Sequence, residues 1–217
     1  MSSVSLVTQV RVLIDERVQG TNGVQDQDIL YWFNAALEQA AEAEAFEANP
    51  TDLALVAGTS NYAAPADFVS PRALVLGGKA LTKASLESIL VAGKDPAATG
   101  TPTHFYVLNN KIYAWPVPVA AANAKLYYFR TPVFFAIDGS GAITPVTPDL
   151  PRTAWQALVK CALTHYLTQQ AEGDISAAGA TETAYQKDIA ALVRAIRKSR
   201  RGQAVRFRSS IEDERRW

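Results

Sequence analysis

Cysteine and histidine are scarce in this sequence, and this limits the chemistry that it can carry. The 217 residues include one cysteine, Cys161, and two histidines, His104 and His165. A single cysteine cannot form an intrachain disulfide bond, which fits a reducing compartment such as a bacterial cytoplasm. Neither histidine has a partner at metal-ligand spacing. We therefore expect no metal site and no cofactor.

Catalytic motifs are also lacking. Cys161 and His165 are four residues apart, so a helix would place them on one face, either as a nucleophile pair or as a buried thiol beside a tolerated histidine. We favour the buried thiol, because no oxyanion site or third catalytic group accompanies the pair. Four carboxylates are clustered in the sequence: Glu38, Glu42, Glu44 and Glu47. They could be acid/base groups or the solvated face of a helix, and we favour the solvated face. We predict that the protein is not an enzyme.

Long apolar runs are absent as well. No stretch approaches the roughly 18 apolar residues that a membrane span needs. Residues 1–4 contain no basic segment leading into an apolar run, so we expect no secretory signal and no membrane partner. The length and the 48% hydrophobic composition are enough to bury one full core, or one core plus a small subdomain.

Charge is unevenly distributed along the chain, although the net charge is zero. Residues 194–217 hold nine basic and three acidic side chains, whereas the rest holds 12 basic and 18 acidic side chains. A basic tail of this kind usually contacts nucleic acid or an acidic protein surface. That surface could belong to a neighbouring copy of the same chain.

Helical periodicity dominates both ends of the sequence. Apolar residues recur at helical spacing within residues 4–48, with turn chemistry at 20–23 and a possible cap at Asp26 or Asp28. Helix is predicted again from about residue 152 and over 175–200. Gly202 is expected to end this last helix, since the remaining residues hold too few apolar groups to fold alone.

The middle of the sequence has the alternation and turn residues of strands. Gly77-Gly78 and Asn109-Asn110 each separate two apolar runs, as in tight hairpins. We therefore predict an α+β fold, in which a helical bundle of N- and C-terminal helices carries an inserted small antiparallel β subdomain and an extended C-terminal arm. The expected parts are a helical hairpin (1–50), the β subdomain (51–137), C-terminal helices completing the bundle (138–201) and the basic arm (202–217).

Aromatic residues gather in the predicted β subdomain. They could stack on bases or fill the core, and we favour the core because aromatic residues in strands usually form cross-strand pairs. They are Phe105, Tyr106, Tyr113, Trp115, Tyr127, Tyr128 and Phe129.

A series of short elements resembles the bacteriophage head-to-tail adaptor (connector) family of the short-tailed-phage type. The elements are Asp28-Ile29-Leu30-Tyr31-Trp32-Phe33-Asn34-Ala35-Ala36, Asn61-Tyr62-Ala63-Ala64-Pro65-Ala66-Asp67-Phe68, Gly100-Thr101-Pro102-Thr103-His104-Phe105-Tyr106, Ile112-Tyr113-Ala114-Trp115-Pro116-Val117-Pro118, Lys125-Leu126-Tyr127-Tyr128-Phe129-Arg130-Thr131-Pro132 and Pro148-Asp149-Leu150-Pro151. Their order and spacing carry the resemblance, which covers most of residues 4–200. Ala64 departs from the leucine that the family favours.

The resemblance implies a structural subunit of a ring. Such adaptors assemble, typically as twelve copies, below the portal protein and above a tail or nozzle protein, around the channel through which DNA passes. The expected location is the head–tail junction of the virion, with assembly in the host cytoplasm. The alternative is a nucleic-acid-binding protein that uses the basic tail, although the sequence has no groove-reading motif.

The basic arm is the segment that we expect to reach a portal or a neighbouring subunit. Arginine suits this role because its planar fork makes bidentate contacts with carboxylates, and aromatic residues suit apolar pockets. The residues predicted to bind are Arg197, Arg200, Arg201, Arg206, Phe207, Arg208, Arg215, Arg216 and Trp217.

Overall fold

The chain forms two units, one helical and one built of strands. The structure, a computed structural model, describes residues 3–14, 24–136, 143–144, 150–170 and 175–213, with the side chains of 179–198 in the last range. Residues 1–46 and 132–217 belong to the helical unit, and residues 47–131 form the β unit. The predicted α+β class, with a sheet-containing insert between N- and C-terminal helices, is confirmed.

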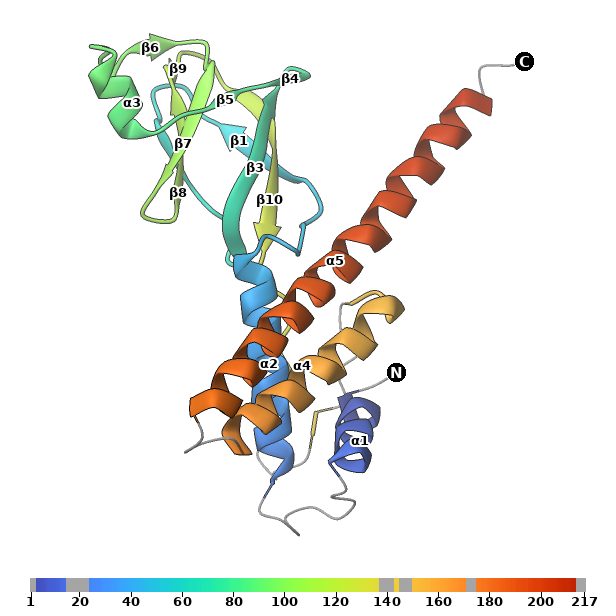
Figure 1. Cartoon of the computed structure of the whole chain (residues 1–217). Coiled ribbons are helices and arrows are strands. Elements are labelled where there is room, and N and C mark those ends of the chain that lie inside the picture. Colours follow the sequence, from blue (N-terminus) through green and yellow to red (C-terminus); the bar gives the residue numbers. More distant parts are fainter. Residues whose placement is uncertain (1–2, 15–23, 137–142, 145–149, 171–174, 214–217) are drawn as a thin grey trace. The chain divides into compact units, whose positions relative to one another are not determined.

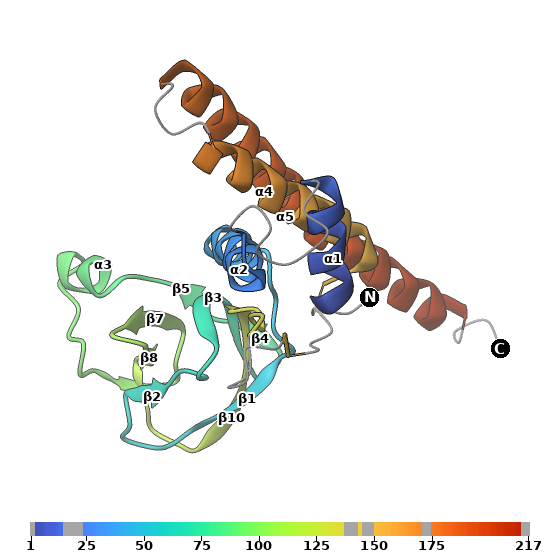
Figure 2. The ribbon, with the colours of Figure 1, turned by 90° about the horizontal axis from the view of Figure 1, so that it is seen from below.

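Helices from both ends of the chain make up the helical unit (Figure 1). They are α1 (Ser3–Leu13), α2 (Asp26–Glu42), α4 (Arg152–Gln170) and α5 (Ile175–Asp213). Figures 1 and 2 both show α4 and α5 running side by side, with α1 and α2 packed against them. The N-cap of α2 is Gln25, not one of the two predicted aspartates. Of these, Asp28 contributes from three residues further on, where its carboxylate accepts a hydrogen bond from the Gln25 N–H (2.7 Å).

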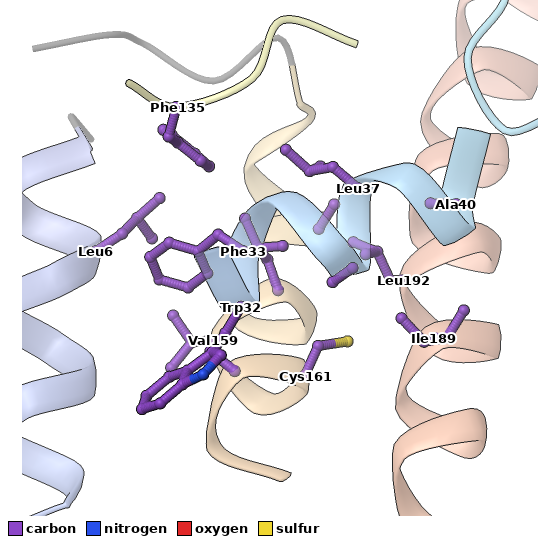
Figure 3. Close-up of a cluster of buried hydrophobic side chains, with 14 of the residues drawn as sticks. Leu6, Trp32, Phe33, Leu37, Ala40, Phe135, Val159, Cys161, Ile189 and Leu192 are labelled. Carbon is purple, nitrogen blue, oxygen red and sulfur yellow. The ribbon is translucent and has the colours of Figure 1, made fainter. Parts of the chain in front are cut away.

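The core of the helical unit draws on every one of these helices. Leu6, Phe33, Leu158 and Leu192 are fully buried and come from α1, α2, α4 and α5 in turn. Figure 3 shows several of these side chains converging between the helices. Burying one large apolar side chain contributes about 1.5–3 kcal/mol, so residues far apart in the sequence hold the unit together.

A buried arginine joins α1 to α2. Arg11 is 6% exposed, and its Nε donates to the Oδ1 of Asp26 over 2.8 Å. Its Nη1 and Nη2 also donate to the backbone carbonyl of Val24 (3.4 and 3.3 Å). A buried guanidinium must find acceptors, because leaving it unpaired costs several kcal/mol. The contact therefore fixes where α2 begins relative to the end of α1.

One asparagine holds the segment that returns from the β unit to the helices. Asn34 on α2 donates from its Nδ2 to the carbonyl of Phe135 and accepts from the Phe135 N–H, both at 2.9 Å. The ring of Phe135 packs against Phe33 with centroids 5.5 Å apart. Farther along, Ser3 Oγ donates to the carbonyl of Thr144 (2.8 Å). Side chains of α1 and α2 thus supply hydrogen-bond partners for backbone groups of the return segment, which lies outside the two sheets.

Helix α5 is longer than the sequence predicted. Gly202 was expected to end it, but the backbone stays helical to Asp213, so the prediction of an extended arm is wrong for residues 202–213. One glycine inside a helix costs only about 1 kcal/mol relative to alanine, and the surrounding arginine, alanine and glutamine residues are good helix formers. With 39 residues, α5 is about 58 Å long. Residues 214–217 lie outside the described residues.

The β unit is a pair of small sheets with two short strands beside them. One sheet has the order β1-β10-β3-β4 and the other β2-β8-β7-β5, while β6 pairs with β9. The strands are β1 (Thr51–Leu55), β2 (Asn61–Ala63), β3 (Phe68–Leu76), β4 (Lys79–Ala80), β5 (Thr82–Lys83), β6 (Thr99–Gly100), β7 (His104–Leu108), β8 (Lys111–Trp115), β9 (Val117–Pro118) and β10 (Ala122–Arg130). Figure 2 looks along this unit, with the two sheets on opposite sides.

Both predicted hairpins are present. Gly77 and Gly78 have positive φ between β3 and β4, and Asn109 and Asn110 have φ of 50° and 55° between β7 and β8. The pairs β5–β7 and β6–β9 are parallel, which the expected antiparallel subdomain did not include. The unit also contains a short helix, α3 (Leu86–Val91), capped by Ser85, whose Oγ accepts from the Ser88 N–H (3.0 Å).

The core of the β unit lies between its two sheets. Leu74 and Leu126 from one sheet meet Phe105 and Ile112 from the other, and all four are essentially fully buried. On the outer side of the second sheet, Ile89 of α3 packs with Tyr106 and Trp115. The strand alternation thus gives the second sheet two buried faces.

Two of the short elements singled out in the sequence meet at one end of this unit. The Tyr128 hydroxyl donates to Asp67 Oδ1 (3.0 Å), and the Thr131 N–H donates to the Asp67 carbonyl (2.8 Å). Phe68 stacks on Tyr128, with ring centroids 5.7 Å apart. Asp67 and Phe68 therefore hold Tyr128 and Thr131 in place, just before the chain leaves the β unit.

We predict that Asn34→Ala weakens the attachment of the return segment. The substitution removes both hydrogen bonds to Phe135, and unsatisfied buried groups cost about 1–3 kcal/mol. Hydrogen exchange at the Phe135 amide should become at least about tenfold faster. Asn123→Ala, an exposed asparagine on β10, serves as the control and should leave that amide unchanged. Equal exchange in both variants would contradict the role assigned to Asn34.

We also predict that Tyr128→Phe destabilises the β unit by about 1 kcal/mol, since it removes one buried hydrogen bond and keeps the ring. Thermal unfolding followed by circular dichroism would measure the change. Tyr127→Phe, at the half-buried neighbouring position, is the matched control and should have a smaller effect. The assignment fails if the two variants unfold at the same temperature.

Candidate interaction surface

Only one of the predicted binding residues has a described side chain, and it lies where α2 ends. Arg197 of α5 is exposed, and its Nη2 donates to the backbone carbonyl of Ala43, the C-terminal cap of α2. The last carbonyls of a helix lack partners within it and carry partial negative charge, so a guanidinium is a favourable partner there. Arg197 therefore combines a structural contact with an exposed position.

An open groove runs along α5 beside Arg197. It has a volume of about 390 Å³ and is lined by Ala43, Gln186, Ile189, Ala190, Val193, Arg194 and Arg197. We refer to these residues as the α5 groove. Ile189 and Val193 are each under 10% exposed and form an apolar floor, whereas Arg194 and Arg197 are exposed at its edge. The groove thus offers apolar area next to positive charge.

The sequence could have located the α5 groove only in part. The groove residues that belong to α5 recur at helical spacing, so the sequence predicts that they share one face of the helix. The contribution of Ala43 was not, because nothing in the sequence indicates that the end of α2 lies beside Arg197. Arg194 was counted among the basic residues of the tail, but it was not assigned to a site.

The other predicted binding residues are not brought together by what the structure describes. Arg200, Arg201, Arg206, Phe207 and Arg208 lie on the helical backbone of α5, and their side chains are outside the described set. Arg215, Arg216 and Trp217 lie outside the described residues altogether. Their role in binding stays a prediction.

The Cys161–His165 pair has the environment of a core, not of a nucleophile. Cys161 is fully buried, and burial raises the pKa of its thiol to about 12, so the thiol is protonated near neutral pH. Burial also lowers the pKa of His165, whose ring stacks on Trp32 with centroids 6.1 Å apart. A protonated thiol cannot act as a nucleophile, so the packing interpretation accounts for the pair better.

The aromatic residues of the β unit mostly fill cores. Phe105, Tyr106, Trp115 and Tyr128 are all under 10% exposed, and Tyr113 stacks on Tyr106 with centroids 4.8 Å apart. Burial is the largest cause that raises the pKa of both Tyr106 and Tyr128. These rings are not available as a platform for bases.

Within the described ranges, no group of histidine, cysteine, aspartate and glutamate side chains is arranged to hold a metal ion. Glu38 and Glu42 on α2 and Glu44 just after it are exposed, which agrees with a solvated helix face. Glu47 does not share that face, because it lies beyond α2, is half-buried and accepts a hydrogen bond from Arg72 Nη1 (2.7 Å). Among the helices searched, none combines the length and apolar character needed to cross a membrane.

Comparison with known proteins places the chain in a family. No curated protein sequence matches it. The family model described as SU10 adaptor protein matches residues 1–208, which span the helical unit, the β unit and most of α5. This match agrees with the resemblance that the short sequence elements carry. The chain therefore belongs to the SU10 adaptor protein family, a family of bacteriophage head-to-tail adaptors.

Proposed function

We propose that this chain is a non-enzymatic ring subunit that joins the portal to the tail around the channel through which DNA passes. The observation that carries the proposal is the family match over residues 1–208, since a structural adaptor role comes with the family. Twelve copies form the ring, with the portal protein above and a tail or nozzle protein below. The ring occupies the head–tail junction of the virion after assembly in the host cytoplasm.

The ring forms through a heterologous interface, in which one face of each copy contacts a different face of the next copy. Such contacts close into a ring when the rotation between copies divides a full turn. The charge distribution supports this arrangement, because residues 194–217 are strongly basic and the remainder is acidic by six charges. Opposite net charges on two different parts of the sequence favour contact between unlike parts of neighbouring copies over self-pairing.

The C-terminal part of α5 carries the contact with the portal. Residues 197–208 hold six basic side chains, and Phe207 interrupts them with a large apolar ring. Arginine forks pair with carboxylates of the portal or of a neighbouring copy, and Phe207 and Trp217 occupy apolar pockets there. Because residues 202–213 have a helical backbone, we infer that the portal meets this part of the chain as a helix and not as the extended arm that the sequence predicted.

Deleting residues 203–217 should abolish binding to the portal and leave both units folded. Among the described side chains of α5, the last buried one is Ile196, so the deletion removes none of the described core. Negative-stain electron microscopy of the chain mixed with its candidate portal would show decorated portal rings for the full chain and bare rings for the deletion. Circular dichroism would verify that the truncated chain is folded.

A charge-neutral variant separates the charge of the arm from its length. Arg200, Arg201, Arg206 and Arg208 replaced together by glutamine keep the helix and remove four positive charges. This variant should decorate few portal rings, whereas Lys79, Lys83, Lys111 and Lys125 replaced by glutamine in the β unit should decorate them normally. Normal decoration by the truncated chain would overturn the assignment of the arm.

DNA binding by the basic tail is the competing function, and the same samples test it. A protein that binds DNA mainly through phosphates loses affinity steeply as salt rises. A full chain that ignores portal rings but retards DNA in a salt-dependent manner, with the deletion losing this property, would replace the adaptor proposal. Weak DNA binding by a chain that also decorates portal rings would leave the adaptor proposal in place.

A further inference from the structure

The imidazole ring of His165 lies among three aromatic rings that come from two other helices. Tyr31 and Trp32 of α2 have ring centroids 6.2 and 6.1 Å from it, and the ring of Tyr185 on α5 is 5.6 Å away. The Trp32 ring stacks on the imidazole, whereas the two tyrosine rings stand almost perpendicular to it, at 88° and 84°. His165 itself belongs to α4, so this one ring lies where α2, α4 and α5 meet.

One nitrogen of the His165 ring is closed off from water. Nδ1 is fully buried and has no hydrogen-bond partner among the described residues. A neutral imidazole carries one proton, and with that proton on Nε2 the buried Nδ1 need not donate. The charged ring carries a proton on both nitrogens, so protonation places an N–H donor where no acceptor lies. An unpaired buried donor is costly, and more so when it is charged.

The titratable groups that face the ring are mostly neutral. Burial raises the pKa of the Cys161 thiol on α4 to about 12, and it raises the pKa of the Tyr185 phenol on α5 to about 12 as well. Tyr31, on α2, also carries an uncharged phenol near neutral pH. Glu182 on α5 supplies a carboxylate whose charge favours the protonated ring, but this side chain is exposed and its charge is screened by water.

Burial opposes the charge of Glu182 and outweighs it. An imidazolium stacked on the indole of Trp32 would also gain a cation–π attraction, which favours protonation. Loss of hydration acts in the other direction, and burial is the largest cause that lowers the pKa of His165 from its ordinary value of 6.5. The neutral ring is therefore the form that suits the site between the three helices.

We propose that His165 is a pH-sensitive latch, which holds α4 against α2 and the N-terminal part of α5 while its ring is neutral and loosens this contact when the ring is protonated. Among the described side chains of α5, Tyr185 is the first that is buried, so the latch acts where the described packing of α5 begins. Leu192 and Ile196 are buried about two and three turns farther along α5. We therefore expect protonation to open the unit locally and to leave the rest of the core packed.

The latch should weaken only as the solution becomes acidic. Because the pKa of His165 is lower in the packed chain than in the opened one, the opened form binds more protons at any pH between the two values. The stability that the latch contributes is complete above the ordinary value of 6.5 and decreases as the pH falls below it. It is lost once the pH passes below the pKa of the packed ring.

Hydrogen exchange of the full-length chain, followed by mass spectrometry at about pH 7.5 and about pH 5, measures this opening. After correction for the intrinsic pH dependence of exchange, peptides from residues 155–170 and 179–196 should lose protection at least about threefold at the lower pH. Peptides from the β unit should change less.

Two single variants separate His165 from other groups that titrate. His165→Gln removes the titrating ring and should abolish the loss of protection at the lower pH. His104→Gln is the matched control, because His104 also contacts a tryptophan, Trp115, with ring centroids 5.4 Å apart, but lies in the β unit. This control should keep the wild-type behaviour. An equal loss of protection in the wild type and in His165→Gln would overturn the latch.

A direct titration keeps the proposal testable if His165→Gln does not fold. The chain has two histidines, so His104→Gln leaves one imidazole signal in the NMR spectrum, that of His165. Titration of this signal should give a pKa below 6.5, and a value at or above 6.5 would reject the latch.

Discussion

The burial of one face of α5 against α2 and α4 is the constraint on which the rest of the structure depends. Tyr185, Ile189, Leu192 and Ile196 are all buried. Together they bind α5 to α2, which precedes the β unit, and to α4, which follows it. Because the core joins both ends of the chain, residues 47–131 are an insertion between two parts of the helical unit. The helical backbone of α5 continues past Ile196, the last buried residue among its described side chains, to Asp213.

The sequence predicted the class and order of elements well, because each rests on local signals. Helical spacing located the helices at both ends, and the residue pairs Gly77-Gly78 and Asn109-Asn110 marked hairpins through the positive φ that they adopt. The prediction failed where the weak conformational preference of one residue differed from the preference of its neighbours. Gly202 was read as a stop, yet its cost is small beside the strong helix formers around it. The parallel pairs β5–β7 and β6–β9 were missed, since strands of two residues leave no alternation to read.

The candidate surface was less accessible to sequence reasoning, because it depends on contacts between distant residues. The excess of positive charge from residue 194 onward drew attention to the right helix. Composition alone does not predict that Arg197 contacts Ala43 at the end of α2. Nor does it predict that Ile189 and Val193 line a groove beside this contact. A charge count treats Arg194 and Arg216 alike, although only the first is seen to border apolar surface.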